Sequence, residues 1–148
     1  MVLSSVRLVA LAVLAAFAIS FADEKEDAIG LVKKAAEFHK KNGREKTVEI
    51  LSKAESDFVN GSLYVFAYDT TGTMVAHPKN AKLIGKNLLE VPDVDGKLFR
   101  KDILELAKAG KTGWVDYKYK NPTTNKVEDK TTYVMKAGDL VLCCGAYK

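Results

Sequence analysis

The spacing of hydrophobic and polar residues changes once along the chain, from a helical period to a strand period. In residues 25–41, apolar positions recur three and four apart and lysines lie largely opposite, which predicts an amphipathic helix. Asn42-Gly43 supplies a C-terminal stop of the expected type, and a second, shorter helix is expected over residues 44–55. Neither helix contains a plausible catalytic constellation, so their lysines are interpreted as a solvated face.

After these helices the pattern becomes that of a sheet, with alternating positions bounded by glycine, proline and asparagine. The expected elements are strands at 63–69, 73–76, 113–120, 129–136 and 140–147, and a short helix at 99–109. The last three strands are joined by connections short enough for hairpins. This order of elements predicts an α+β domain built on a mostly antiparallel sheet of five strands.

The hairpin formed by the first two strands is the most informative feature. Tyr64, Phe66 and Tyr68 alternate with smaller residues along its first strand, so the three aromatic rings share one face. Its second strand delivers His77, which Pro78 follows directly. A single imidazole at a strand end, behind a row of aromatic rings, indicates a site for a small molecule.

The first 22 residues have the pattern of an export signal. Arg7 precedes a nearly unbroken apolar run over residues 8–19, and Ser20-Phe21-Ala22 places small residues at positions −3 and −1. Cleavage before Asp23 is therefore expected, which would place the protein in the periplasm or outside the cell. Cleavage after Ala18 is an alternative. A retained membrane anchor is another, although the run is shorter than the ~20 residues that a bilayer span requires.

Removal of the first 22 residues leaves residues 23–148 as a single domain of 126 residues with 22 basic and 19 acidic side chains. These charges are interspersed and form no basic block with exposed aromatics, so nucleic-acid binding is not expected. The sequence contains no haem-attachment, zinc or nucleotide-binding motif, and its only histidines are His39 and His77. No cofactor is therefore expected, and an all-histidine metal site is excluded.

The two cysteines, Cys143 and Cys144, are adjacent in the last strand. An exported protein with an even number of cysteines often forms disulfides. Neighbouring residues of one strand point to opposite faces, however, so a vicinal bridge would distort the strand. Two small buried thiols are therefore expected, with the vicinal bridge as the alternative.

Seven short motifs follow one another through this part of the chain. They are Tyr64-Val65-Phe66, Gly72…His77-Pro78, Leu83 to Asn87, Asp95-Gly96-Lys97, Gly113 to Tyr117, Lys130…Tyr133 and Gly145-Ala146-Tyr147. In this order they resemble a single Cache domain, the extracytoplasmic sensor module of chemoreceptors and sensor kinases, which is similar in fold to PAS domains. The resemblance runs from about Glu26 to Tyr147. It implies a long N-terminal helix, a five-stranded antiparallel sheet, and a ligand pocket between the sheet and the loop and helix that cross it.

The resemblance also implies a function. Members of this family typically sense small organic acids, such as short-chain carboxylates, or other metabolites. In membrane receptors two transmembrane helices bracket the module and a signalling domain follows it, whereas this sequence stops at Lys148. We therefore expect a standalone exported sensor that passes its ligand state to a separate partner, such as a membrane receptor or kinase.

Two other classes of function are alternatives to a sensor. The first is an interaction module that forms a homodimer and binds no small ligand. The second is an enzyme, which is not expected, because the sequence shows no activated serine or cysteine with a base, no metal set and no recognisable carboxylate pair.

The candidate ligand-binding residues come from four strands: His77, Tyr117, Lys130, Tyr64, Phe66, Trp114 and Tyr133. One ring nitrogen of His77 could donate to a carboxylate while the backbone holds the other; the alternative is that His77 only fixes the loop at Pro78. Lys130 could neutralise an anion, or it could be an exposed lysine at a strand end.

The aromatic candidates are separated by the alternation of strand faces. Tyr117 is the preferred hydroxyl donor, and Trp114, on the other face of its strand, is equally suited to an ordinary core. At least one of the aromatic residues of the first strand should be plain packing. Lys130 and Tyr133 are three residues apart, so they cannot both line one pocket unless a bulge intervenes.

Overall fold

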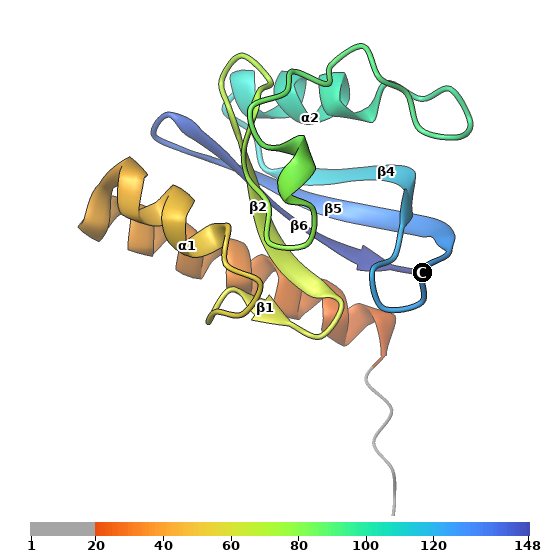
Figure 1. The fold of residues 1–148 in the computed structure, drawn as a ribbon, viewed down its shortest axis with the longest axis horizontal. Helices are drawn as coiled ribbons and strands as arrows, with labels where there is room; N and C mark the ends of the chain where they lie inside the picture. The colour runs from red at the N-terminus through yellow and green to blue at the C-terminus, as the bar shows by residue number, and fades with distance from the viewer. Residues whose placement is uncertain (1–19) are drawn as a thin grey trace, which may run out of the picture.

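The structure is a computed structural model that describes residues 20–148, so the predicted export segment lies almost entirely outside the described residues. Figure 1 shows an antiparallel sheet with helix α1 (Phe21–Leu51) on one side and helix α2 (Phe99–Lys108) on the other. The long connection before α2 contains a short 3-10 helix, η1 (Ala81–Leu83), whose Leu83 packs on the α2 side. The predicted α+β fold with a long N-terminal helix is confirmed.

The sheet has the strand order β1-β2-β6-β5-β4, and β3 pairs with the same edge of β2 as β1 does. The strands are β1 (Val59–Asn60), β2 (Leu63–Asp69), β3 (Met74–Ala76), β4 (Gly113–Lys120), β5 (Val127–Ala137) and β6 (Leu140–Tyr147). All neighbours are antiparallel, and the last strand, β6, lies between β2 and β5 at the centre. Strand β1 is additional to the five predicted strands. It has two residues and is too short to give a periodic pattern.

Helix α1 begins earlier than the apolar stripe predicts, because a capping box fixes its start. The hydroxyl of Ser20 accepts a hydrogen bond from the Asp23 N–H at 3.2 Å, and the Asp23 carboxylate accepts one from the Ser20 N–H at 3.3 Å. The predicted break between two helices is present as a kink at Gly43, where φ is 82° and ψ is 175°. The second part ends at Leu51, so the expected extension to residue 55 is wrong.

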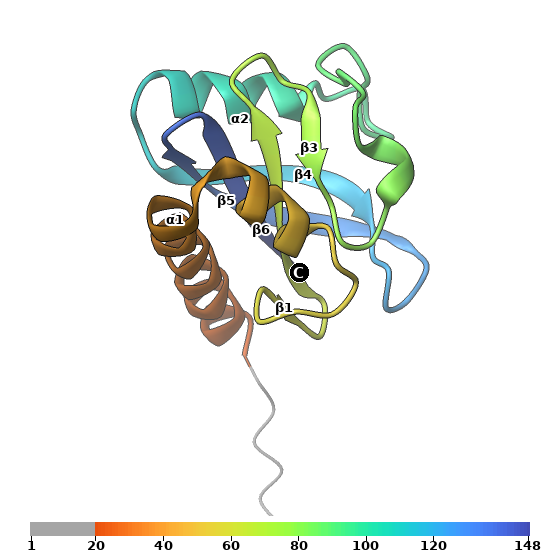
Figure 2. The ribbon, with the colours of Figure 1, turned by 60° about the vertical axis from the view of Figure 1, so that its left-hand side comes forward.

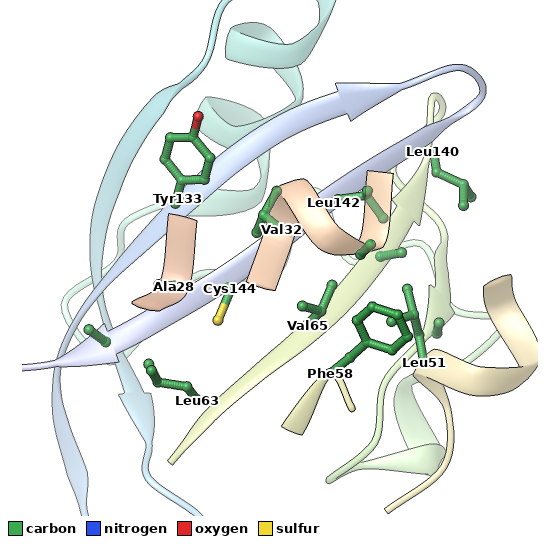
Figure 3. Packing of buried hydrophobic residues seen from close by; sticks show 14 residues of the cluster. Ala28, Val32, Leu51, Phe58, Leu63, Val65, Tyr133, Leu140, Leu142 and Cys144 are labelled. Carbon is green, nitrogen blue, oxygen red and sulfur yellow. The ribbon is translucent and has the colours of Figure 1, made fainter. Parts of the chain in front are cut away.

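Helix α1 covers a largely apolar face of the sheet, and Figure 3 shows the hydrophobic residues buried there. Val32 of α1, Val65 of β2 and Leu142 of β6 are fully buried there. Cys144 lies on this face and Cys143 on the other, and both are buried free thiols, as expected. Burial raises the pKa of the Cys144 thiol to about 12, which disfavours a reactive thiolate. The opposite orientation of the two side chains disfavours a vicinal disulfide.

Helix α2 covers the second face from the side opposite α1, as the turned view in Figure 2 also shows. Within the described residues, no helix has both the length and the apolar character needed to cross a membrane. Two packing layers thus share one sheet, and the layer under α2 contains the polar groups described next.

Candidate functional site

The face of the sheet under α2 is lined with aromatic rings from three strands. Tyr64, Phe66 and Tyr68 project from β2, as the alternation predicts, and neighbouring rings lie 5.9 Å apart between centroids. From β4, the ring of Tyr117 is stacked on Phe99 of α2, with centroids 3.9 Å apart and planes 5° from parallel. This stack fixes the start of α2 against the sheet.

Lys130 of β5 is buried among these rings and is 1% exposed. Its Nζ donates a hydrogen bond to the Tyr64 hydroxyl at 3.1 Å. The same Nζ lies 4.6 to 6.0 Å from five ring centroids, those of Tyr64, Phe66, Tyr117, Tyr119 and Tyr147. In residues 20–148 no acidic side chain pairs with it, and burial lowers its pKa to about 8. The rings stabilise the cation in part, but a buried ammonium ordinarily requires an anion.

Gly145 of β6 makes room for the Lys130 side chain. It faces Thr132 across the β5–β6 pair, and a Cβ at this position would overlap Lys130 Cε and come within 2.5 Å of the Thr132 hydroxyl oxygen. The lysine stem therefore runs flat across the backbone of β6. Gly145 was part of a sequence motif, but its role depends on the register of two strands and could not be predicted from the motif.

His77 follows the end of β3 and is 3% exposed. Its Nδ1 accepts hydrogen bonds from the backbone N–H groups of Lys79 at 3.1 Å and Asn80 at 2.9 Å. Burial, and then the positive charges of Lys130 and Arg100, lower the pKa of the imidazole to about 3. The ring is therefore neutral with its hydrogen on Nε2, so the same side chain fixes the loop and retains one N–H donor.

Arg100, near the start of α2, is a member of this site that the sequence reasoning missed. Its side chain is buried, its guanidinium carbon lies 4.3 Å from the centroid of the Phe99 ring, and one Nη donates to the Val91 carbonyl at 3.2 Å. A signal was present: Arg100 precedes Ile103 by three residues and Leu104 by four, which places it on the apolar stripe of its helix.

Lys130, His77 and Arg100 surround one small cavity between the sheet and the elements that cross it. The space holds about 10 Å³ for the centre of a water molecule, close to the ~10–15 Å³ that a single water needs. His77 and Tyr119 also line a separate open hollow of about 330 Å³, together with Asn80 and Pro122.

Two larger hollows, of about 480 and 510 Å³, flank α1. Every lysine, arginine and glutamate that lines them is at least partly exposed. In the described part of the chain, no cluster of three histidine, cysteine or acidic residues could hold a metal ion. The small cavity is therefore where the buried charges meet.

The structure brings together five of the seven predicted residues and separates two. Lys130, His77, Phe66 and Tyr117 line the cavity, and Tyr64 contacts it through its hydrogen bond to Lys130. The other two are cross-strand partners on the α1 face, Trp114 and Tyr133, with centroids 5.4 Å apart. The register of β5 is regular from Lys130 to Tyr133, so no bulge turns the latter toward the cavity.

Three further tyrosines belong to the site. Tyr68 and Tyr119 line the cavity, and Tyr147 is the cross-strand partner of Lys130. The Tyr117 hydroxyl, the preferred ligand donor on the sequence alone, forms a buried hydrogen bond with the Thr132 hydroxyl at 2.8 Å.

Comparison with known proteins is consistent with this architecture. The family profile described as the Cache domain matches residues 14–147. A solved periplasmic sensor domain of a chemotaxis protein is 27% identical, with a TM-score of 0.66 over 86% of this chain and 92% of the other. A Cache chemosensory domain studied for carboxylic acid recognition has a TM-score of 0.72 over 86% and 95% of the two chains, and its 20% identity shows a shared fold alone.

A sequence relative has a longer chain. The sensor histidine kinase MctS of Rhizobium johnstonii is 35% identical over 72 residues, which are 49% of this chain. The match spans 15% of the kinase. The similarity therefore concerns one part of that protein.

Proposed function

Because this chain belongs to the Cache domain family, a family of sensor domains related to those of periplasmic chemoreceptors and histidine kinases, we propose that it binds a small carboxylate. The site is the cavity between Lys130 and His77. Binding there is a signalling event, which the protein passes to a separate partner such as a membrane receptor or kinase.

The observation that carries this proposal is the buried Lys130 ammonium without an anion. Within residues 20–148 its only hydrogen bond from Nζ goes to the neutral Tyr64 hydroxyl. Burying a charge without a partner is costly, and a protein that keeps such a charge beside a cavity gains most by binding an opposite charge there. A carboxylate would supply that charge and would accept hydrogen bonds from the ammonium.

His77 adds a second donor of a suitable kind. Its Nδ1 is occupied by the loop backbone, so only Nε2–H is free for a ligand. A neutral imidazole donates without adding a third positive charge beside Lys130 and Arg100. Lys130 of β5 and His77 at the end of β3 would then both donate hydrogen bonds to one carboxylate. The aromatic rings would exclude water around it.

We also propose that the protein is exported and that residues 1–22 are removed. The periplasmic location named for one structural relative supports this, and so does the apolar N-terminal run. Helix α1 begins at Phe21, so cleavage after Ala22 would remove its cap and first residues. Intact mass of the exported protein tests the proposal: a mature N-terminus at Asp23 supports it, and full-length protein in the membrane fraction contradicts it.

A thermal-shift screen tests carboxylate binding directly. The purified protein is heated with short-chain carboxylates, amino acids and amines; a ligand at 100 times its Kd adds about 2.7 kcal/mol of stability. Lys130→Met should weaken carboxylate binding by about tenfold to a hundredfold, the effect of losing a hydrogen bond to a charged group. Lys136→Met is the matched control, because Lys136 lies on the same strand and is exposed.

The screen has two results that overturn the proposal. A flat response over the whole panel favours the interaction module, and size measurement would then show whether the chain forms a homodimer. Retained carboxylate affinity in Lys130→Met places the ligand elsewhere.

A further inference from the structure

Arg100 gives the cavity a second buried positive charge. It is 5% exposed, and Lys130 is 1% exposed. Neither side chain forms an ion pair in the described part of the chain, whereas the next residue, Lys101, pairs with Glu90 at 2.6 Å. A single carboxylate at Lys130 would therefore leave one of the two buried charges without a counter-charge.

The two cations come from different layers of the fold but line the same cavity. Lys130 comes from the sheet and Arg100 from α2, and both line the one small cavity. Both positive charges also lower the pKa of His77, so both act on the same imidazole. A ligand that fills this cavity lies between them.

The guanidinium of Arg100 also has an unused donor. One Nη is bound to the Val91 carbonyl, and the guanidinium lies against the ring of Phe99. Its Nε is buried and has no hydrogen-bond partner among the residues the structure describes. Buried donors are normally satisfied, so an orphan N–H on a charged group beside a cavity indicates a missing acceptor.

We propose that Arg100 binds a second carboxylate of the same ligand, so that the site selects short dicarboxylates over monocarboxylates of equal length. This inference rests on the proposed function. One carboxylate accepts hydrogen bonds from Lys130 Nζ and His77 Nε2–H, and the other accepts from Arg100 Nε–H. The two negative charges neutralise the two buried cations.

Binding must widen the cavity, because the present space admits about one water molecule. The sheet is held by strand pairing on both sides of Lys130, whereas α2 is joined to it by side-chain packing. A dicarboxylate therefore moves Arg100 and the start of α2 away from the sheet. Hydrogen exchange of backbone amides at the start of α2 reports this movement.

The test compares ligands of equal carbon number by calorimetry on the purified protein. Malonate is compared with propionate, and succinate with butyrate. Malonate or succinate should bind at least about tenfold more tightly than its partner, the lower limit for a hydrogen bond to a charged group. Pyruvate is a third arm, because its oxo group is a neutral acceptor on a three-carbon chain.

Variants then assign the preference to Arg100. Arg100→Gln should weaken the dicarboxylates by about tenfold or more and the monocarboxylates by less than about threefold. Lys101→Gln is the control, because it removes a positive charge from the next residue, whose side chain is half-exposed. It should change the affinity for neither ligand series. The comparison of ligands on the unmodified protein keeps the proposal testable if Arg100→Gln does not fold.

Three results overturn the proposal while leaving the carboxylate site intact. They are equal or tighter binding of the monocarboxylates, pyruvate binding as tightly as malonate, and equal losses for both ligand series in Arg100→Gln. Absence of binding in both series overturns the proposed function itself, and so does binding that Lys130→Met leaves unchanged.

Discussion

The two faces of the sheet are built from the same strands and bury different chemistry. Under α1, residues such as Val65 and Leu142 form a buried apolar layer. Under α2, the intervening positions of the same strands contribute tyrosines and Lys130, and the crossing segments add His77 and Arg100. One face contains no buried charge in the described residues, and the other contains two without counter-ions.

Adjacent residues show how sharply the faces are divided. Cys143 and Cys144 are neighbours in β6, yet each belongs to a different packing layer. Lys130 lowers the pKa of both thiols, although burial raises each by more. The period of two therefore allows one strand to stabilise the fold with one set of side chains and to present a site with the other.

This comparison teaches which face was built for stability. Hydrocarbon burial stabilises the domain at about 25 cal/mol per Å² on the α1 side. Unpaired charges on the α2 side do the reverse, because each charge loses its hydration. Truncation of a buried apolar side chain on the α1 face should therefore lower the free energy of unfolding, and replacement of a buried charge on the α2 face by an apolar side chain should raise it.

The largest expected effect is on the α1 face. Leu142 is fully buried, so Leu142→Ala removes apolar burial and leaves a cavity, and the free energy of unfolding should fall by about 2–5 kcal/mol. Urea denaturation measures the change. Val127→Ala is the control: this residue is 51% exposed, and its truncation should stay within about 0.5 kcal/mol. Equal losses in both variants would contradict the assignment of the core.

Lys130→Met should have the opposite sign in the protein without ligand. An apolar side chain of similar length removes the buried charge, and the free energy of unfolding should rise by about 1–4 kcal/mol, the range found when buried ion pairs are replaced by apolar groups. The same urea titration measures it, with Lys136→Met as the exposed control. A large loss of stability would mean that Lys130 has a structural counter-charge after all.

The pH dependence of this gain is fixed by the lowered pKa of Lys130. The folded pKa is about 8 and the unfolded value is 10.5. Burial therefore destabilises the wild type fully below pH 8, and this penalty is lifted as pH rises toward 10.5, because the unfolded state then holds more protons. The advantage of Lys130→Met should shrink over that interval, as urea titrations at pH 7 and pH 10 would show.

His77 makes a smaller contribution to the pH dependence of stability, at acidic pH. Its pKa is about 3 in the fold and 6.5 in the unfolded chain, so wild-type stability should fall below pH 6.5 by up to about 1.4 kcal/mol per pH unit. His77→Asn leaves an oxygen near the N–H groups of Lys79 and Asn80 but cannot be protonated. The difference between the two proteins from pH 6.5 to pH 5 should show this slope, and parallel curves would contradict it.

The strands were predictable where turn residues bound them on both sides. The limits of β4 and β6 were predicted correctly for this reason, although β6 is buried along its whole length and shows no alternation of burial. Strand β1 is too short for a period, and the start of α1 is set by the Ser20 cap, which lies within the predicted export segment. Such features depend on local hydrogen bonds that periodicity does not report.

The site was predictable in its strand residues and in His77, which directly follows a strand. The alternation of side chains along a strand alone predicted that Lys130 and Tyr133 lie on opposite faces, and likewise Tyr117 and Trp114. The structure has them so. Arg100 required knowing that the apolar stripe of α2 faces the same rings. The role of Gly145 required the register of β5 and β6, which arises from tertiary pairing.

The smallest expected effect compares one hydroxyl on each face. The Tyr117 hydroxyl shares a buried 2.8 Å hydrogen bond with Thr132, so Tyr117→Phe should lower the free energy of unfolding by about 0.5–1.5 kcal/mol. Ligand affinity should change by less than about threefold, because that hydroxyl already has a partner. Tyr133→Phe is the matched change on the α1 face, where the hydroxyl has no hydrogen bond among the described residues, and stability should stay within about 0.5 kcal/mol. Urea denaturation and calorimetry on both variants separate the outcomes.

A different result for Tyr117→Phe would change the role of this residue. If the variant leaves stability unchanged and lowers ligand affinity about tenfold, the hydroxyl turns from Thr132 to the ligand on binding. Tyr117 then belongs with Lys130 and His77 as a ligand donor.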